Sequence, residues 1–214
     1  SAGNGRGAAG GRMTRSGNRL GLVAALLAVA LAFWLDPWAW KHAGVPGIYE
    51  RDWGRLLRVT GSLVFWAPLA VAVWLEDRGR QPRGAGRAWL LLFGPALAGG
   101  VAELLKVVLR RERPGLHDGA YFFRPFVERL FDTRDLGLPS SHTMVAFGGA
   151  SVLARLFPRA APVGYLLAAG CAASRVMAGA HFVSDVTVGA LAGWLVGAVL
   201  WRHFGRKSSG KLLP

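Results

Sequence analysis

The sequence contains a single cysteine, Cys171, among its 214 residues. One cysteine excludes an intrachain disulfide and a cluster of thiolate metal ligands. Because Cys171 lies within an apolar run, we expect it to pack as a small core residue.

Recognisable metal ligands are also missing. The sequence has no HExxH motif, no pair of histidines at ligand spacing and no cluster of carboxylates. We therefore expect neither a metal nor another cofactor.

Acidic residues are scarce, with 12 Asp and Glu against 26 Lys and Arg, which gives a net charge of +14. Such an excess can reflect nucleic acid, anionic lipid or an anionic substrate as the partner. The basic residues lie between long apolar segments with no nucleic-acid-binding module around them, so we expect no nucleic acid partner. Positive loops flanking membrane spans account for much of the charge.

Apolar residues are abundant, at 52% of the chain, and only 18% of residues are charged, against about 25% in soluble domains. The apolar residues form long blocks without a helical or strand period. This pattern predicts an all-α polytopic membrane protein with six transmembrane helices in one domain. The expected spans are residues 20–40, 58–74, 88–109, 142–157, 163–178 and 183–201.

The two ends of the chain differ from this membrane domain, which we assign to residues 19–206. Residues 1–18 are rich in Gly, Arg, Ser and Asn and are expected to form a disordered tail, with Met13 as a candidate natural start. Residues 207–214 are expected to be a tail or a tag remnant. The first apolar run is not followed by a small-x-small cleavage pattern, so we expect it to be retained as a span.

The stretch 106–114, KVVLRRERP, places cations at the end of the third span. Lys106 and Arg113 are seven residues apart and share one face if the helix continues to Pro114. Two cations on one face suit a phosphoryl group, although basic side chains also snorkel at span ends. Glu103 lies one turn before Lys106 and could pair with it or point from another face.

The stretch 139–142, PSSH, opens the fourth span. Ser140 and Ser141 could donate to an anion from a helix start, or act as ordinary helix caps. His142 at this position could donate a proton to a leaving oxygen.

The stretch 174–185, SRVMAGAHFVSD, lies at the seam between the last two spans. Ionisable residues at such depth are functional candidates. Asp185 follows His181 by four residues, so its carboxylate can fix the imidazole tautomer and raise the nucleophilicity of the other ring nitrogen. With Arg175, the three stretches together describe metal-independent phosphoryl transfer to a histidine.

In order and spacing, these stretches resemble the motifs of the type 2 phosphatidic acid phosphatase (PAP2) superfamily. They match K-x6-RP, PSGH with Ser141 in place of glycine, and SR-x5-H-x3-D. The resemblance implies a membrane-integral bacterial lipid phosphatase with a six-helix bundle. Since Ser141 keeps its backbone N–H, we expect activity to survive the replacement of glycine.

The resemblance also implies a role for each matched residue. His181 is the expected nucleophile, and Asp185 is its orienting partner. His142 is expected to protonate the leaving alcohol and then to activate water. The expected phosphate ligands are Lys106, Arg113, Arg175, Ser140 and Ser141.

The expected partner is a phosphorylated lipid, with undecaprenyl diphosphate, phosphatidylglycerol phosphate, phosphatidic acid and lipid A as candidates. In loop 115–138, Arg124 and Arg129 could contact its head group or simply be solvated. A lipid phosphotransferase and a non-catalytic lipid-binding or transport protein are the alternative functions. The sequence does not indicate an oligomeric state.

When the three expected phosphate-binding cations are left out of the count, the membrane side that holds both termini has more Lys and Arg than the other side. The positive-inside rule then predicts cytoplasmic termini. With the resemblance to bacterial lipid phosphatases, this places the protein in the inner membrane, with its site on the periplasmic face.

Overall fold

The computed structural model describes residues 7–80 and 85–205, which form a bundle of helices without a β-strand in these ranges. The expected all-α fold is confirmed. The predicted C-terminal tail, residues 207–214, and residues 1–6 of the predicted N-terminal tail lie outside the described residues, whereas residues 7–18, which were expected to be disordered, are helical. The main helices are α1 (Gly7–His42), α2 (Asp52–Val59), α3 (Leu63–Arg80), α4 (Ala85–Leu109), α5 (Ser141–Leu156), α6 (Ala161–Met177) and α7 (Val183–Leu200). Short turns of helix are η1 (Ile48–Glu50), η2 (Pro114–Leu116), η3 (Pro158–Ala160) and η4 (Trp201–Gly205).

Each of the six predicted spans corresponds to a long helix, but not all are equally suited to cross a membrane. Four stretches are long and apolar enough, namely Arg19–His42, Ala85–Leu109, Pro158–Met177 and Val183–Gly205. Helices α2 and α3 add a fifth if this pair, bent by 67°, is one broken span. Helix α5 has only 16 residues, below the roughly 20 that span a bilayer.

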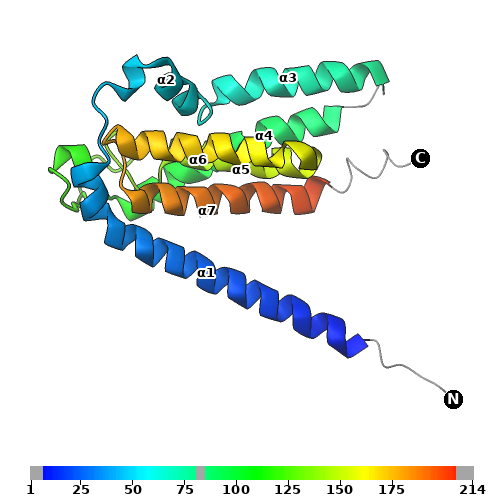
Figure 1. Ribbon diagram of the computed structural model, residues 1–214, viewed down its shortest axis with the longest axis horizontal. Coiled ribbons are helices and arrows are strands. Elements are labelled where there is room, and N and C mark those ends of the chain that lie inside the picture. The colour runs from blue at the N-terminus through cyan, green and yellow to red at the C-terminus, as the bar shows by residue number, and fades with distance from the viewer. Residues whose placement is uncertain (1–6, 81–84, 206–214) are drawn as a thin grey trace.

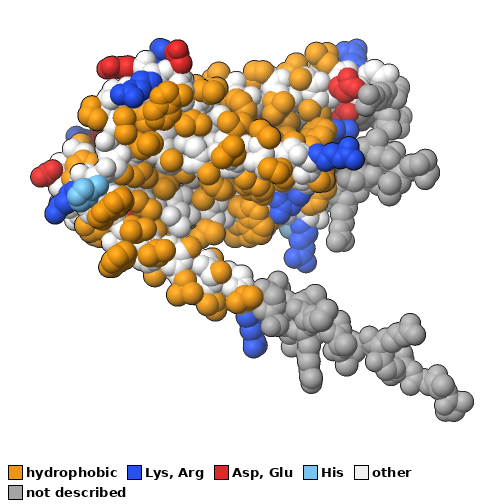
Figure 2. All heavy atoms as spheres, in the orientation of Figure 1, with side chains coloured by type: hydrophobic (Ala, Val, Ile, Leu, Met, Phe, Trp, Pro, Cys, Tyr) orange, Lys and Arg blue, Asp and Glu red, His pale blue; other side chains and the backbone are white. Residues whose placement is uncertain are grey.

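The surface of the bundle agrees with a membrane protein. Hydrophobic side chains cover its flank, while charged side chains gather toward its two ends (Figure 2). Among the exposed apolar residues are Leu26, Val64 and Leu166. Apolar side chains are tolerated on such a surface when lipid covers it.

Helix α5 forms the centre of the bundle and packs against α4, α6 and α7. The contact with α7 depends on small residues, as expected for a ridge of glycines at every fourth position. A Cβ at Gly193 would lie 2.4 Å from the carbonyl oxygen of Met144, and one at Gly197 would lie 2.7 Å from that of Gly148. The absence of side chains therefore allows the two backbones to approach.

One end of the bundle collects all three sequence motifs. Helices α4 and α6 end there, α5 and α7 begin there, and the loop after α4 folds over them (Figure 1). Helix α1 starts near the opposite end, where α7 finishes, and leans away from the bundle toward its first residues (Figure 1). The three motifs can form one site only if the connections after α4 and α6 lie at the same end of the bundle. Both connections do lie at that end (Figure 1).

Helix α4 ends at the residue expected for the third span, and it does not continue to Pro114. The helix stops at Leu109, five residues before Pro114, and Arg110 adopts a positive φ of 54°. Residues 111 and 112 then form isolated antiparallel bridges with the loop at Phe123 and Leu136. The helix therefore does not carry Lys106 and Arg113 on a shared face, and loop pairing positions Arg113 instead.

Candidate active site

The site is centred on a buried histidine and carboxylate. His181 lies in the turn between α6 and α7, and Asp185 lies in the first turn of α7. His181 Nδ1 is 3.4 Å from Asp185 Oδ2, which is an ion-pair distance but long for a hydrogen bond. The same Oδ2 accepts a hydrogen bond of 2.9 Å from the backbone N–H of Phe182. The structure therefore brings the two residues together as their spacing predicted.

Arg111 holds the other oxygen of this carboxylate, a contact that sequence reasoning missed. Its Nη2 donates to Asp185 Oδ1 at 2.5 Å and to Ser184 Oγ at 2.7 Å. The guanidinium is fully buried. It lies 5.0–5.1 Å from the centres of three aromatic rings, those of Phe33, Tyr121 and Phe182. The motif spacing did not single out Arg111. It is one of three arginines between Lys106 and Pro114, and only Arg113 matches the motif.

Asp36 connects helix α1 to the residues around Asp185 and Arg111. Its Oδ1 accepts a hydrogen bond of 2.9 Å from the backbone N–H of Ser184, whose hydroxyl donates to Oδ2. Tyr121 donates its hydroxyl to Oδ2 at 2.8 Å. Burial and the Asp36 carboxylate raise the pKa of Tyr121 to about 12, so the phenol remains a donor. Helix α1 is thus anchored at the site although its other end leans away.

Two of the expected phosphate-binding cations face the same cavity as His181. This cavity has a volume of ≈ 650 Å³ and includes Arg113 and Arg175 in its lining. The buried Nε atoms of both arginines have no hydrogen-bond partner in the described part of the chain. Arg175 Nη1 donates to the hydroxyl of Tyr49 at 2.8 Å. Burial and the charge of Arg175 lower the pKa of Arg113, which shows how closely positive charge is gathered here.

Lys106 lies in the last turn of α4 and pairs with Glu103. Its Nζ is 3.0 Å from Glu103 Oε1, so the first of the two open alternatives for Glu103 is confirmed. The same oxygen accepts a hydrogen bond of 2.6 Å from Ser141 Oγ, and Oε2 accepts one from Thr133. The hydroxyl that replaces the family's glycine therefore binds a carboxylate.

Ser140 and His142 flank Ser141 at the start of α5. The backbone N–H of Ser140 donates to the carbonyl oxygen of Asp185 at 3.1 Å, and its Oγ accepts from Thr143 at 3.1 Å. This N–H is therefore already used within the protein. The charges of Arg175, His181 and Lys106 act on His142, but His142 is not among the residues that line the cavity.

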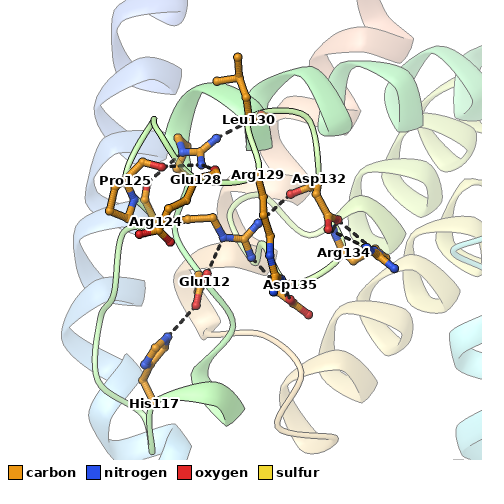
Figure 3. A network of polar contacts seen from close by, with 11 residues as sticks. Glu112, His117, Arg124, Pro125, Glu128, Arg129, Leu130, Asp132, Arg134 and Asp135 are labelled. Atoms are coloured by element: carbon orange, nitrogen blue, oxygen red, sulfur yellow. Dashed lines mark hydrogen bonds and ion pairs between the residues drawn. The ribbon is translucent and has the colours of Figure 1, made fainter.

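Arg124 and Arg129 belong to a polar network of the loop (Figure 3), and neither lines the cavity. Arg124 is buried, and its Nε donates to Glu112 Oε1 at 2.6 Å. Burial raises the pKa of Glu112, but hydrogen bonds from His117 and Arg124 outweigh this effect and leave it lowered. Arg129 is exposed and lies 3.3 Å from Asp135. Neither cation lines the cavity, because the loop's own carboxylates bind both.

The protonation state of His181 suits a nucleophile. Burial lowers its pKa to about 4, although Asp185 opposes the shift, and the charges of Arg175 and Arg113 lower it further. The imidazole is therefore neutral near pH 7. A neutral ring with Nδ1 toward a carboxylate leaves Nε2 free to attack.

The chain is similar to a known family and to several known proteins. A family model described as "PAP2 superfamily" matches residues 87–209. A lipid A 1-phosphatase from Rhizobium johnstonii is 30% identical over 176 residues, covering 77% of this chain and 69% of the relative. A decaprenylphosphoryl-5-phosphoribose phosphatase from Mycobacterium tuberculosis is 33% identical over 116 residues, covering 53% of this chain and 60% of the relative.

A solved structure shares the fold. The crystal structure of a transmembrane PAP2-type phosphatidylglycerolphosphate phosphatase from Bacillus subtilis matches with a TM-score of 0.62 at 21% identity. The match covers 87% of this chain and 94% of the other. At this identity the match supports the helical arrangement and carries no statement about the substrate.

Proposed function

Because this chain belongs to the PAP2 superfamily and is a phosphoric monoester hydrolase, we propose that it removes phosphate from a membrane lipid through a phosphohistidine. The observation that carries this proposal is the buried pair of His181 and Asp185 at a cavity lined by Arg113 and Arg175. A nucleophile, its orienting carboxylate and two phosphate-binding cations thus meet at one point.

The first step transfers the phosphoryl group to the protein. His181 Nε2 attacks phosphorus while Nδ1–H faces Asp185, so that a P–N bond forms as the P–O bond to the lipid breaks. The electron pair of that bond leaves with the lipid oxygen. In this proposal His142, on which the charge of His181 acts, supplies the proton that this oxygen needs. In the second step His142 takes a proton from water, and the hydroxide displaces His181 from phosphorus.

The cations stabilise the charge that spreads over the phosphoryl oxygens in both transition states. Arg113 and Arg175 present buried Nε groups for this purpose, and among the described residues these groups have no hydrogen-bond partner. Lys106 is held by Glu103, and an incoming phosphate competes with that carboxylate for the ammonium. The Ser141 hydroxyl helps to orient Glu103, and through it Lys106.

The substrate class that we propose is a phosphorylated lipid of the bacterial inner membrane. Similarity to a lipid A 1-phosphatase and to a decaprenylphosphoryl-5-phosphoribose phosphatase supports a lipid substrate. Undecaprenyl diphosphate, phosphatidylglycerol phosphate, phosphatidic acid and lipid A are the candidates. We further propose cytoplasmic termini and a site on the periplasmic face, because Lys and Arg outside the site are in excess on the side of the termini.

The test is phosphate release by the detergent-purified chain in the presence of EDTA, with the four candidate lipids as substrates. We expect activity with at least one lipid and a loss of at least about 10³-fold in His181→Ala, the scale of loss seen when a covalent nucleophile is removed. His203→Ala is the matched control, because His203 is exposed and bonds the carbonyl of Val199 at the opposite end of the bundle. Full activity of His181→Ala would exclude the mechanism.

A further inference from the structure

A short segment before α3 closes one side of the cavity and lies outside all three sequence motifs. It consists of η1 and α2, and it contributes Tyr49 and Arg58 to the cavity lining. The guanidinium carbon of Arg58 lies 4.9 Å from the centre of the Tyr49 ring, and that of Arg175 lies 5.6 Å from the same centre. One tyrosine therefore positions two arginines, of which only Arg175 belongs to a motif.

The backbone holds this segment firmly in place. A Cβ at Gly54 of α2 would lie 2.0 Å from the carbonyl oxygen of Ile48 in η1, so the two elements touch. A Cβ at Gly61, just after α2, would lie 2.6 Å from the carbonyl oxygen of His142. These two approaches fix the end of α2, and with it Arg58, against the start of α5.

Arg58 has no acidic partner among residues 19–79 and 85–205. Arg55, one turn earlier on α2, pairs with Asp52 at 2.6 Å. The charge of Arg58 acts on His142. Arg58 is therefore an available cation in the cavity lining, on the helix whose end approaches the residue that we propose as the acid, His142.

The charge balance of the proposed reaction leaves Arg58 without a role on a simple monoester. The phosphoryl group carries at most about two negative charges near pH 7, and Lys106, Arg113 and Arg175 already oppose them. A leaving alcohol is neutral once protonated. A fourth cation beside the leaving group is useful when the leaving group has a charge of its own.

We propose that Arg58 is a specificity-determining residue that binds an anionic group, namely a second phosphate, on the leaving part of the substrate. The proposal rests on the proposed function of the site. It assigns a diphosphate-bearing lipid as the preferred substrate class, with Arg58 against the phosphate that departs with the lipid. In that reaction Nε2 of His181 takes the terminal phosphoryl group, and the lipid monophosphate leaves.

The test compares two substrates that differ by one phosphate, farnesyl phosphate and farnesyl diphosphate, with the full chain in detergent. We expect Arg58→Ala to lower kcat/KM for the diphosphate on the order of tenfold, as for loss of a hydrogen bond to a charged group. The loss for the monophosphate should be several-fold smaller, and Arg58→Lys should recover part of the diphosphate rate. Arg55→Ala is the matched control and should leave both rates unchanged.

The outcomes separate this inference from the proposed function. Equal losses on both substrates, or no loss on either, would overturn the role of Arg58 while phosphate release by the unmodified chain still supports a phosphatase. No release from either substrate or from the four candidate lipids by the unmodified chain would overturn the proposed function and the role of Arg58 with it. Retained monophosphate activity in Arg58→Ala also shows that the variant is folded.

Discussion

Replacing Arg111 by methionine should damage both stability and catalysis, because its guanidinium is the only cation bonded to the Asp185 carboxylate within the described residues. Both side chains are fully buried. Removal of one partner of a buried ion pair costs about 3–5 kcal/mol, since the other charge is left without compensation. The backbone N–H of Phe182 still donates to Asp185, so we expect a cost near the lower limit, about 3 kcal/mol.

The catalytic effect should depend on the same carboxylate. Without Arg111, Asp185 is free to rotate away from His181 Nδ1, and we expect kcat with a water-soluble phosphate monoester to fall on the order of tenfold to a hundredfold. KM should change less, because Arg111 does not line the cavity. The assay is steady-state phosphate release, together with thermal unfolding in detergent.

A double-mutant cycle with Asp185→Asn tests whether the two residues act as a pair. The amide carries no charge, so Arg111→Met should cost about 2 kcal/mol less in the Asp185→Asn background than in the original chain. The matched control is Arg110→Met. Arg110 is equally buried but donates to loop carbonyls, including that of Arg124. The Arg110→Met variant should lose stability, and this loss should be the same with Asp185 and with Asp185→Asn.

Strict additivity of Arg111→Met and Asp185→Asn in both unfolding and kcat would show that the two residues do not act as a pair. An Arg111→Met variant with unchanged kcat would refute the reasoning. A loss of kcat in Arg110→Met that couples equally to Asp185→Asn would show that the whole loop, rather than the Arg111 bond, holds the carboxylate.

Three further predictions concern other parts of the molecule. Burial lowers the pKa of His181 from 6.5 to about 4 in the folded chain. On acidification the unfolded chain therefore protonates at His181 before the folded chain does. In unfolding measurements, the contribution of His181 to stability should be lost as the pH falls from about 6.5 toward 4. The acidic limb of kcat/KM due to this residue should lie near pH 4, and a limb near 6.5 that disappears in His181 variants would contradict this. Gly193→Ala should lower unfolding stability by about 1–3 kcal/mol, because its Cβ meets a carbonyl of α5, whereas Gly100→Ala, with nothing within 4 Å, should not. Ser141→Gly should change kcat/KM by less than about tenfold, since it removes only a hydroxyl bound to Glu103, and an inactive variant would show that the hydroxyl contacts phosphate.

Several features of the fold followed from the sequence because they depend on local composition. Long apolar blocks predicted the helices. The spacing of His181 and Asp185 at the start of a helix predicted their contact, since one helical turn brings such residues together. Local geometry alone was sufficient for each of these features.

Other features stayed open in the sequence because they depend on contacts between distant segments. Continuation of α4 to Pro114 was a condition for a shared face of Lys106 and Arg113, and the chain instead pairs residue 111 with Phe123 after Leu109. Arg124 could have contacted a head group or been solvated, and in the structure Glu112 and a loop carbonyl bind it. Both outcomes were decided by the path of the loop after α4, which composition does not specify.

The membrane character, the helical class and the three motifs could be predicted from the sequence, because each of these is encoded in hydrophobic blocks and short spacings. The motifs also selected Arg113 and Arg175, which line the cavity, but the places of the other arginines depend on the folded chain. Arg111 is buried on Asp185, Arg58 reaches the cavity from α2, and Arg124 is held by its own loop. The physical reason is that a guanidinium's role is decided by the nearest carboxylate or open cavity, and these partners lie far away in the sequence.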